Sequence, residues 1–195
     1  MSAQGNHEDA ELQPTFAEGY KPTAAKSLDA YRELDKEDES LARWKASLGI
    51  GANAPAEASG PKVTVISLTL TSDSLFRPIV LHLSDKENFK KNPITIKEGA
   101  EYSVTVEFKV NHGLTTGLRF IQVVKRAGLT VDRLDAMIGS YTAGEAPYRK
   151  QMHTESAPSG LIARSGSYTA RSRVTDDDKE VYADFEWVFK LGKEW

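Results

Sequence analysis

The chain has 195 residues, a hydrophobic fraction of 39%, a formal net charge of −3 and no cysteine. The weak negative charge disfavours nucleic acid and anionic membranes as partners, and the lack of cysteine excludes disulfides, thiolate zinc sites and cysteine nucleophiles. No apolar run approaches the roughly 20 residues that a membrane-spanning helix needs, and residues 1–10 are too polar for a signal peptide. These properties predict a cytosolic protein with one domain and an appendage.

Residues 1–25 are predicted to be a disordered tail. They are rich in Gly, Pro, Glu, Asn and Gln, and so cannot bury enough apolar surface to offset the entropy of ordering. Phe16, Tyr20 and Pro22 stand out in this segment. They are either chance tail residues or an extended anchor that becomes ordered on a partner.

Residues 26–49 are predicted to form a short helical hairpin. Ser27 is placed to cap a first helix, and Asp35 or Asp38 to cap a second. The second helix would carry an apolar stripe at helical spacing and end at Gly49; the stripe comprises Leu41, Trp44 and Leu48. Because an isolated helix of this length is unstable in water, this arm must dock on its own body or on a partner.

A linker is predicted at residues 50–61, where Gly, Ala, Pro and Ser dominate, and a β-rich domain at residues 62–195. The alternation of apolar and polar residues is most regular at Tyr102–Val110 and Val181–Leu191. Further strands are predicted at residues 63–70, 78–83, 118–124, 137–141, 148–153 and 166–174. Short strands joined by Gly, Asn and Asp turns are typical of an immunoglobulin-like antiparallel β-sandwich.

The predicted domain offers no recognisable catalytic set. The four histidines have no metal-ligand spacing, neither Gly139-Ser140-Tyr141 nor Gly166-Ser167-Tyr168 is a nucleophile elbow, and no glycine-rich phosphate loop occurs. The acidic run Asp176–Asp178 is either a solvated turn or a contact for a basic partner. These patterns favour a binding module without a metal or cofactor over an enzyme such as a small hydrolase.

Large apolar residues, among them Phe108, Phe120 and Trp187, are more numerous than a thin sandwich needs. They would form either an ordinary core or a sandwich whose sheets separate to admit an apolar ligand. Periodicity does not distinguish these alternatives.

Several segments, in the same order over about 175 residues, resemble the Rho GDP-dissociation inhibitor family. The matching segments are Gly19–Pro22, Leu34–Leu41, Leu68–Leu70, Lys97–Tyr102, Phe120–Gln122, Met137–Tyr141, Ser172–Lys179 and Phe185–Trp187. The resemblance implies a protein that binds prenylated, preferentially GDP-bound Rho-family GTPases, inhibits GDP release and extracts the GTPase from membranes into the cytosol. It implies a monomer when free, with only transient membrane contact.

The resemblance also implies two sets of contact residues. For the GTPase switch regions these are Tyr20, Asp38, Ser40, Leu41, Trp44, Leu48 and Asp178. For a geranylgeranyl or farnesyl group between the sheets they are Leu70, Ile94, Leu114, Met137, Phe185 and Trp187. The family often has Trp at the position of Phe185 and Phe at that of Ile94, which implies smaller side chains in this pocket.

The alternative interpretation is a general prenyl-binding solubilising factor for lipidated proteins. Such a carrier would have little use for the acidic arm at residues 34–41, and the arm therefore favours the inhibitor.

Overall fold

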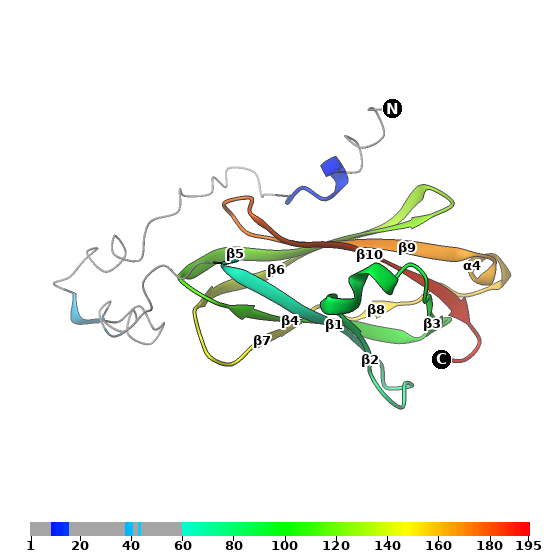
Figure 1. The fold of residues 1–195 in the computed structure, drawn as a ribbon. Coiled ribbons are helices and arrows are strands. Elements are labelled where there is room, and N and C mark those ends of the chain that lie inside the picture. The colour runs from blue at the N-terminus through cyan, green and yellow to red at the C-terminus, as the bar shows by residue number, and fades with distance from the viewer. Residues whose placement is uncertain (1–8, 16–37, 41–42, 44–59) are drawn as a thin grey trace.

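A computed structural model describes residues 9–15, 38–40, 43 and 60–195. Within residues 60–195 the chain forms a two-layered β-sandwich with short helical segments (Figure 1). The strands are β1 (Val63–Thr71), β2 (Ile79–His82), β3 (Ile94–Lys97), β4 (Glu101–Val110), β5 (Leu114–Arg126), β6 (Leu129–Thr142), β7 (Tyr148–Gln151), β8 (Glu155–Ser156), β9 (Ser167–Thr175) and β10 (Val181–Gly192). A 3₁₀ segment, η1 (Leu83–Asn88), follows β2, and a short helix, α4 (Leu161–Arg164), precedes β9.

One sheet has the strand order β2-β1-β4-β7, with β8 paired to β4, and the other has the order β3-β10-β9-β5-β6. The predicted sandwich is confirmed, with one exception to its antiparallel character. β3 runs parallel to β10, with Ile94 opposite Phe189. β3 was not predicted as a strand.

The core lies between the two sheets and follows the alternation in sequence. In β4, Val104, Val106, Phe108 and Val110 are all at most 3% exposed. In β1, a register shift between Val65 and Ser67 moves the buried face from Val65 to Leu68 and Leu70. The shift keeps both halves of β1 on the core, although the apolar residues change parity.

β5 is buried on both faces, because both carry apolar residues. Leu118, Phe120 and Val124 point into the sandwich, whereas Ile121 and Val123 pack with Leu12 in a separate small cluster. Residues 9–15, part of the predicted disordered tail, form a helical turn on this outer face (Figure 1). The remainder of the tail, almost all of the arm and most of the linker lie outside the described residues, so those boundaries remain predictions.

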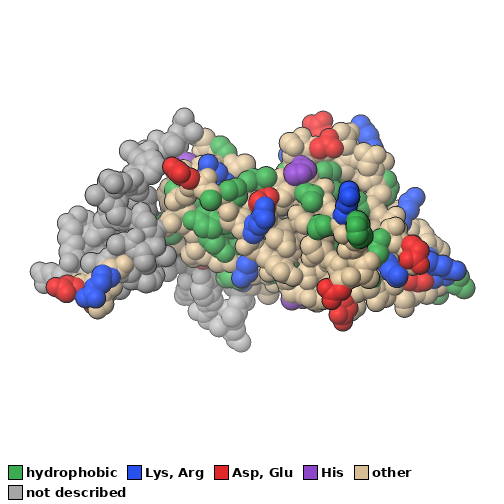
Figure 2. Space-filling view, turned by 90° about the horizontal axis from the view of Figure 1, so that it is seen from below, with side chains coloured by type: hydrophobic (Ala, Val, Ile, Leu, Met, Phe, Trp, Pro, Cys, Tyr) green, Lys and Arg blue, Asp and Glu red, His purple; other side chains and the backbone are tan. Residues whose placement is uncertain are grey.

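The face of the sandwich seen in Figure 2 carries Lys, Arg, Asp and Glu side chains scattered among hydrophobic ones. In the same sheet as β1, Arg149 of β7 and Glu107 of β4 form an ion pair at 2.8 Å. Charges of one sign do not gather into a stripe on this face, as they would on a nucleic-acid-binding surface. Among the described residues, no helix has the length and apolarity needed to cross a bilayer.

Candidate functional site

The acidic turn between β9 and β10 divides its three aspartates into different environments. Asp176 is 1% exposed, and its carboxylate accepts the backbone N–H groups of Asp178 at 3.0 Å and Glu180 at 3.1 Å. The Tyr182 hydroxyl donates to the same carboxylate at 2.5 Å, and burial next to it raises the pKa of Tyr182. Asp176 therefore shapes the turn.

The neighbouring Asp177 lies against β5. Its backbone N–H donates to the Thr116 carbonyl at 3.2 Å, and a Cβ at Gly117 would come within 2.0 Å of its carboxyl carbon. Gly117 also has a φ of +61°, which favours glycine. Both the space taken by Asp177 and this backbone conformation therefore require glycine at position 117. Asp178, in contrast, is exposed at the tip. Of the three aspartates, Asp178 is the one presented to solvent.

Asp38 and Ser40 lie at the start of the second predicted helix. Residues 39, 40 and 43 are helical, and the Asp38 carboxylate accepts the backbone N–H of Ser40 at 2.8 Å, as an N-cap does. Both residues are exposed, as are Glu39 and Arg43, which pair at 3.6 Å. Tyr20, Leu41, Trp44 and Leu48 lie outside the described residues.

A narrow apolar cavity lies between the sheets at their β2 and β3 edges. Its volume is about 10 Å³, and it is lined by Leu68, Leu70, Ile79, Leu81, Ile94, Val104 and Trp187. The structure thus brings together Leu70, Ile94 and Trp187 of the predicted isoprenyl-binding set. All seven lining side chains are apolar, which suits a hydrocarbon ligand and no polar one.

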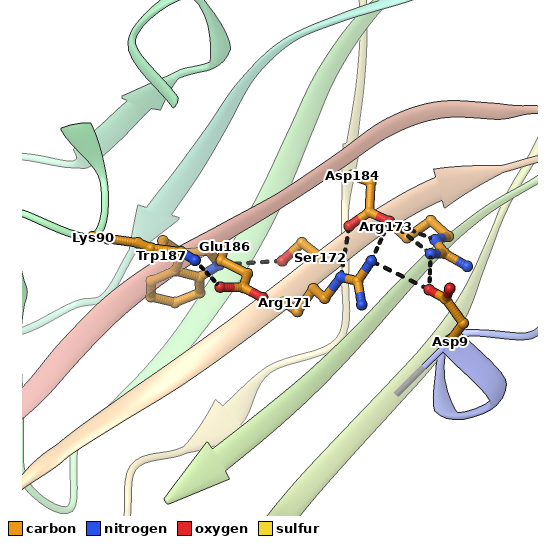
Figure 3. Close-up of polar contacts among 8 residues, drawn as sticks. All are labelled: Asp9, Lys90, Arg171, Ser172, Arg173, Asp184, Glu186 and Trp187. Atoms are coloured by element: carbon orange, nitrogen blue, oxygen red, sulfur yellow. Dashed lines mark hydrogen bonds and ion pairs between the residues drawn. The ribbon is translucent and has the colours of Figure 1, made fainter. Parts of the chain in front are cut away.

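Trp187 is held in this wall by a buried hydrogen-bond chain. Its indole N–H donates to Ser172 Oγ at 3.1 Å (Figure 3). Ser172 in turn donates to Gln122 Oε1 at 3.0 Å. Ser172 and Gln122 are at most 2% exposed. A buried indole needs such a partner, and this chain fixes the ring against the cavity.

The other predicted isoprenyl contacts lie elsewhere. Phe185 is buried and packs edge to face on Phe89, with ring centroids 6.0 Å apart. Leu114 begins β5 and is half-buried, and Met137 is 46% exposed on β6. The structure does not bring Phe185, Leu114 or Met137 into the cavity.

A larger, open groove of about 660 Å³ lies between the sheets on the side of β6 and β8. Its walls are mixed: Phe189 and Tyr168 are aromatic, whereas Glu155 and Asp132 are acidic. Burial raises the pKa of Glu155, which accepts the Tyr102 hydroxyl at 3.0 Å. The ring centroids of Phe189 and Trp187 are 5.4 Å apart. Because Phe189 lines the groove and Trp187 lines the cavity, these two adjacent rings connect the two spaces.

Known proteins resemble this chain over most of its length. The sequence profile described as RHO protein GDP dissociation inhibitor matches residues 3–194. The chain belongs to the Rho GDP-dissociation inhibitor family. It is 41% identical to Rho GDP-dissociation inhibitor 1 of Homo sapiens over 90% of this chain and 86% of that one. The Rho GDP-dissociation inhibitor of Schizosaccharomyces pombe is 40% identical over 87% and 84% of the two chains, and that of Saccharomyces cerevisiae 38% over 89% and 90%.

For this member of the family, sequence reasoning missed part of the cavity wall and its support. Four wall residues lie in strands that the sequence predicts, but their positions alone give no sign of a shared cavity; they are Leu68, Ile79, Leu81 and Val104. The role of Ser172 was not predicted, because a hydrogen bond across two strands leaves no local pattern in the sequence. Among the described residues, no group of three or more His, Cys, Asp or Glu side chains is arranged to hold a metal ion.

Proposed function

We propose that this protein binds prenylated Rho-family GTPases, slows their release of GDP, extracts them from membranes and keeps them soluble in the cytosol. The observation that carries the proposal is the wholly apolar cavity between the sheets, in a chain of this family. The geranylgeranyl or farnesyl group of the GTPase is the proposed ligand of this cavity. The protein acts as a carrier and regulator, not as an enzyme.

The cavity must enlarge to receive that ligand. Pockets for ligands of this size usually have volumes of roughly 300–1,000 Å³, whereas the cavity measures about 10 Å³. Three of its lining residues, Ile79, Leu81 and Ile94, belong to four-residue strands at the edges of their sheets. Since an edge strand is held by one neighbour alone, outward movement of β2 and β3 is the least costly way to open the cavity.

The lipid pocket and the acidic arm have complementary tasks. Burying each methylene is worth about 0.8 kcal/mol, whether in the protein or in the bilayer, so the lipid transfer by itself is close to neutral. Protein–protein contacts must therefore supply the free energy that favours extraction. Asp38 and Asp178, both exposed, are the proposed acidic contacts for the GTPase switch regions, with Tyr20, Ser40, Leu41, Trp44 and Leu48 completing the surface.

Clamping the switch regions explains inhibition of GDP release, because nucleotide leaves when those segments open. It also explains the proposed preference for the GDP-bound form, whose switches are the less ordered and can adapt to the arm. We propose that the free protein is a monomer and touches membranes only during extraction and delivery. The competing proposal of a general prenyl carrier predicts no dependence on the GTPase surface.

Membrane extraction tests the function. Membranes carrying a prenylated, GDP-loaded Rho-type GTPase are incubated with the protein, and GTPase in the soluble fraction is measured. The inhibitor proposal predicts release of this GTPase and little release of an unrelated prenylated protein. Equal release of both would favour the general carrier, and release of neither would overturn both proposals.

A further inference from the structure

A seven-residue strap, Asp9–Thr15, lies on the outer face of the β3-β10-β9-β5-β6 sheet. Its central Leu12 is 1% exposed and packs on Ile121 and Val123, which are 0% and 2% exposed. These two residues lie on the face of β5 opposite the sandwich core. The strap thus covers an apolar spot that its own sheet would otherwise present to water.

Arginines fix the backbone of the strap. Arg133 donates to the carbonyl oxygens of Glu11 at 3.0 Å and Gln13 at 2.8 Å, and Arg119 donates to that of Thr15 at 2.9 Å. The Thr15 N–H donates to Asp135 at 2.8 Å, and Asp135 also accepts from Arg119 at 2.9 Å. These bonds set the direction in which the chain leaves the strap.

Charge complementarity fixes its side chains. Asp9 lies 2.8 Å from Arg173 and 3.3 Å from Arg171, beside the Asp184 carboxylate that both arginines also contact (Figure 3). Glu11 lies 3.3 Å from Lys125. The Thr130 hydroxyl donates to Glu11 at 2.7 Å. Both acidic side chains of the strap therefore meet basic partners, which lie on two neighbouring strands, β9 and β5.

The chain is also fixed where it rejoins the sandwich. Asn111 donates to the Pro61 carbonyl at 2.8 Å, and His112 Nε2 lies 3.0 Å from the Gly60 carbonyl oxygen. Lys62 Nζ lies 4.0 Å from Asp176, so this attachment is at the end of the sandwich that carries the acidic turn. Arg119, whose side chain holds Thr15, lies on β5 opposite Thr175 of β9, and Thr175 is next to the same turn. Thr15 and Gly60 are thus both held at the end of the sandwich that carries the acidic turn.

We infer that the strap is a second anchor for the chain that follows it, so that the segment between Thr15 and Gly60 is attached to the sandwich at both of its ends. This inference rests on the proposed function and adds a device to it. A loop with two fixed ends explores less space than a tail with one, so the arm meets a GTPase docked at the turn at a higher effective concentration. Releasing the strap should weaken binding of the GTPase by about three- to tenfold.

Leu12→Asp is the variant that should release the strap, and Gln13→Ala is its matched control. The Gln13 side chain is exposed and its contact with Arg133 is through the carbonyl, so alanine preserves the bond. Because the chain has no cysteine, Ala10→Cys together with Leu129→Cys provides a unique pair for nitroxide labels. Pulsed electron spin resonance should give a short, narrow distance distribution in the labelled parent and the Gln13→Ala variant, and a broad one in Leu12→Asp.

A charge exchange separates docking from damage to the fold. Lys125→Glu should broaden the distance distribution, and adding Glu11→Lys to it should narrow the distribution again. Dissociation constants for a prenylated, GDP-loaded Rho-type GTPase are then measured without labels. The inference predicts about three- to tenfold weaker binding by Leu12→Asp, and unchanged binding by Gln13→Ala.

Two results would overturn the inference alone: a distance distribution that Leu12→Asp leaves narrow, or a broadened distribution with unchanged affinity for the GTPase. If the unmodified protein binds no prenylated Rho-type GTPase, the proposed function fails, and the role of the anchor fails with it. The spin-label distances, measured without the GTPase, separate these cases.

Discussion

The carboxylate of Asp176 accepts the backbone N–H of Asp178 at 3.0 Å, so one aspartate of the acidic turn fixes the backbone position of another. The three consecutive aspartates have three different environments. Asp176 is buried, Asp177 packs against Gly117, and Asp178 is exposed.

Asp176→Ala should therefore lower mainly the stability of the fold, and Asp178→Ala mainly the affinity for the GTPase. Asp176→Ala removes the acceptor of three hydrogen bonds and should lower the free energy of unfolding by about 2–3 kcal/mol, while Asp178→Ala should change it by less than about 0.5 kcal/mol. Binding of a prenylated Rho-type GTPase by Asp178→Ala should weaken about fivefold. Urea unfolding and a binding titration measure the two quantities. Comparable destabilisation by both variants would refute this division of tasks.

Asp38 combines a charge with an N-cap, and two substitutions separate these properties. Asp38→Ala removes both, whereas Asp38→Ser keeps a good cap and loses the charge. If the carboxylate contacts the GTPase, both variants should need about tenfold more protein to inhibit GDP release. Inhibition by Asp38→Ser at the unmodified protein's concentration would show that only the cap matters. Glu39→Ala, which removes a neighbouring exposed charge, is the control.

Asp184 should make stability depend on acid pH. Burial alone would raise the pKa of this carboxyl, but hydrogen bonds from Arg171 at 2.9 Å and Arg173 at 2.6 Å hold it below its usual 3.8. A pKa lowered by folding contributes stability that is complete above the unfolded value and is lost as pH falls through the folded one.

The free energy of unfolding should thus fall below about pH 3.8 more steeply in the unmodified protein than in Asp184→Asn. Urea titrations between pH 6 and pH 2.5 measure this difference. A gap between the two proteins that stays constant over this range would contradict the role given to Asp184.

The apolar cavity can be blocked from its edge. Ile94→Trp adds a large side chain to β3, where Ile94 is only partly buried, and should abolish membrane extraction while the protein stays folded. Leu129→Trp on β6, a position 72% exposed and outside the cavity wall, should extract normally. Normal extraction by folded Ile94→Trp would place the lipid in another part of the sandwich, the 660 Å³ groove being the first to examine.

Sequence periodicity predicted the strands that alternate over a long run, and most of the fold follows from them. The run Tyr102–Val110 lies within β4, and Val181–Leu191 within β10. The alternation is absent where both faces of a strand are exposed: the first part of β6, from Leu129 to Arg133, is exposed at every residue and was not predicted. Residues 137–141, which were predicted, are the end of that strand.

Parts of the candidate site depend on contacts between distant residues, which no local pattern reveals. Leu12 sits in a polar segment, and its burial requires Ile121 and Val123, more than a hundred residues along the chain. Asp176 and Asp178 differ only through turn geometry. The resemblance in sequence supplied the set containing Leu70, Ile94 and Trp187, and the side-chain packing then separated these three from Phe185, Leu114 and Met137.

The rate of GDP dissociation tests the central proposal most directly. A prenylated Rho-type GTPase loaded with a fluorescent GDP analogue is mixed with excess unlabelled nucleotide, with and without the protein, and the decay of fluorescence is followed. The proposed function predicts that a saturating amount of the protein slows the decay at least about tenfold, equivalent to about 1.4 kcal/mol of barrier. An unchanged rate, with the GTPase shown to be bound, would contradict it.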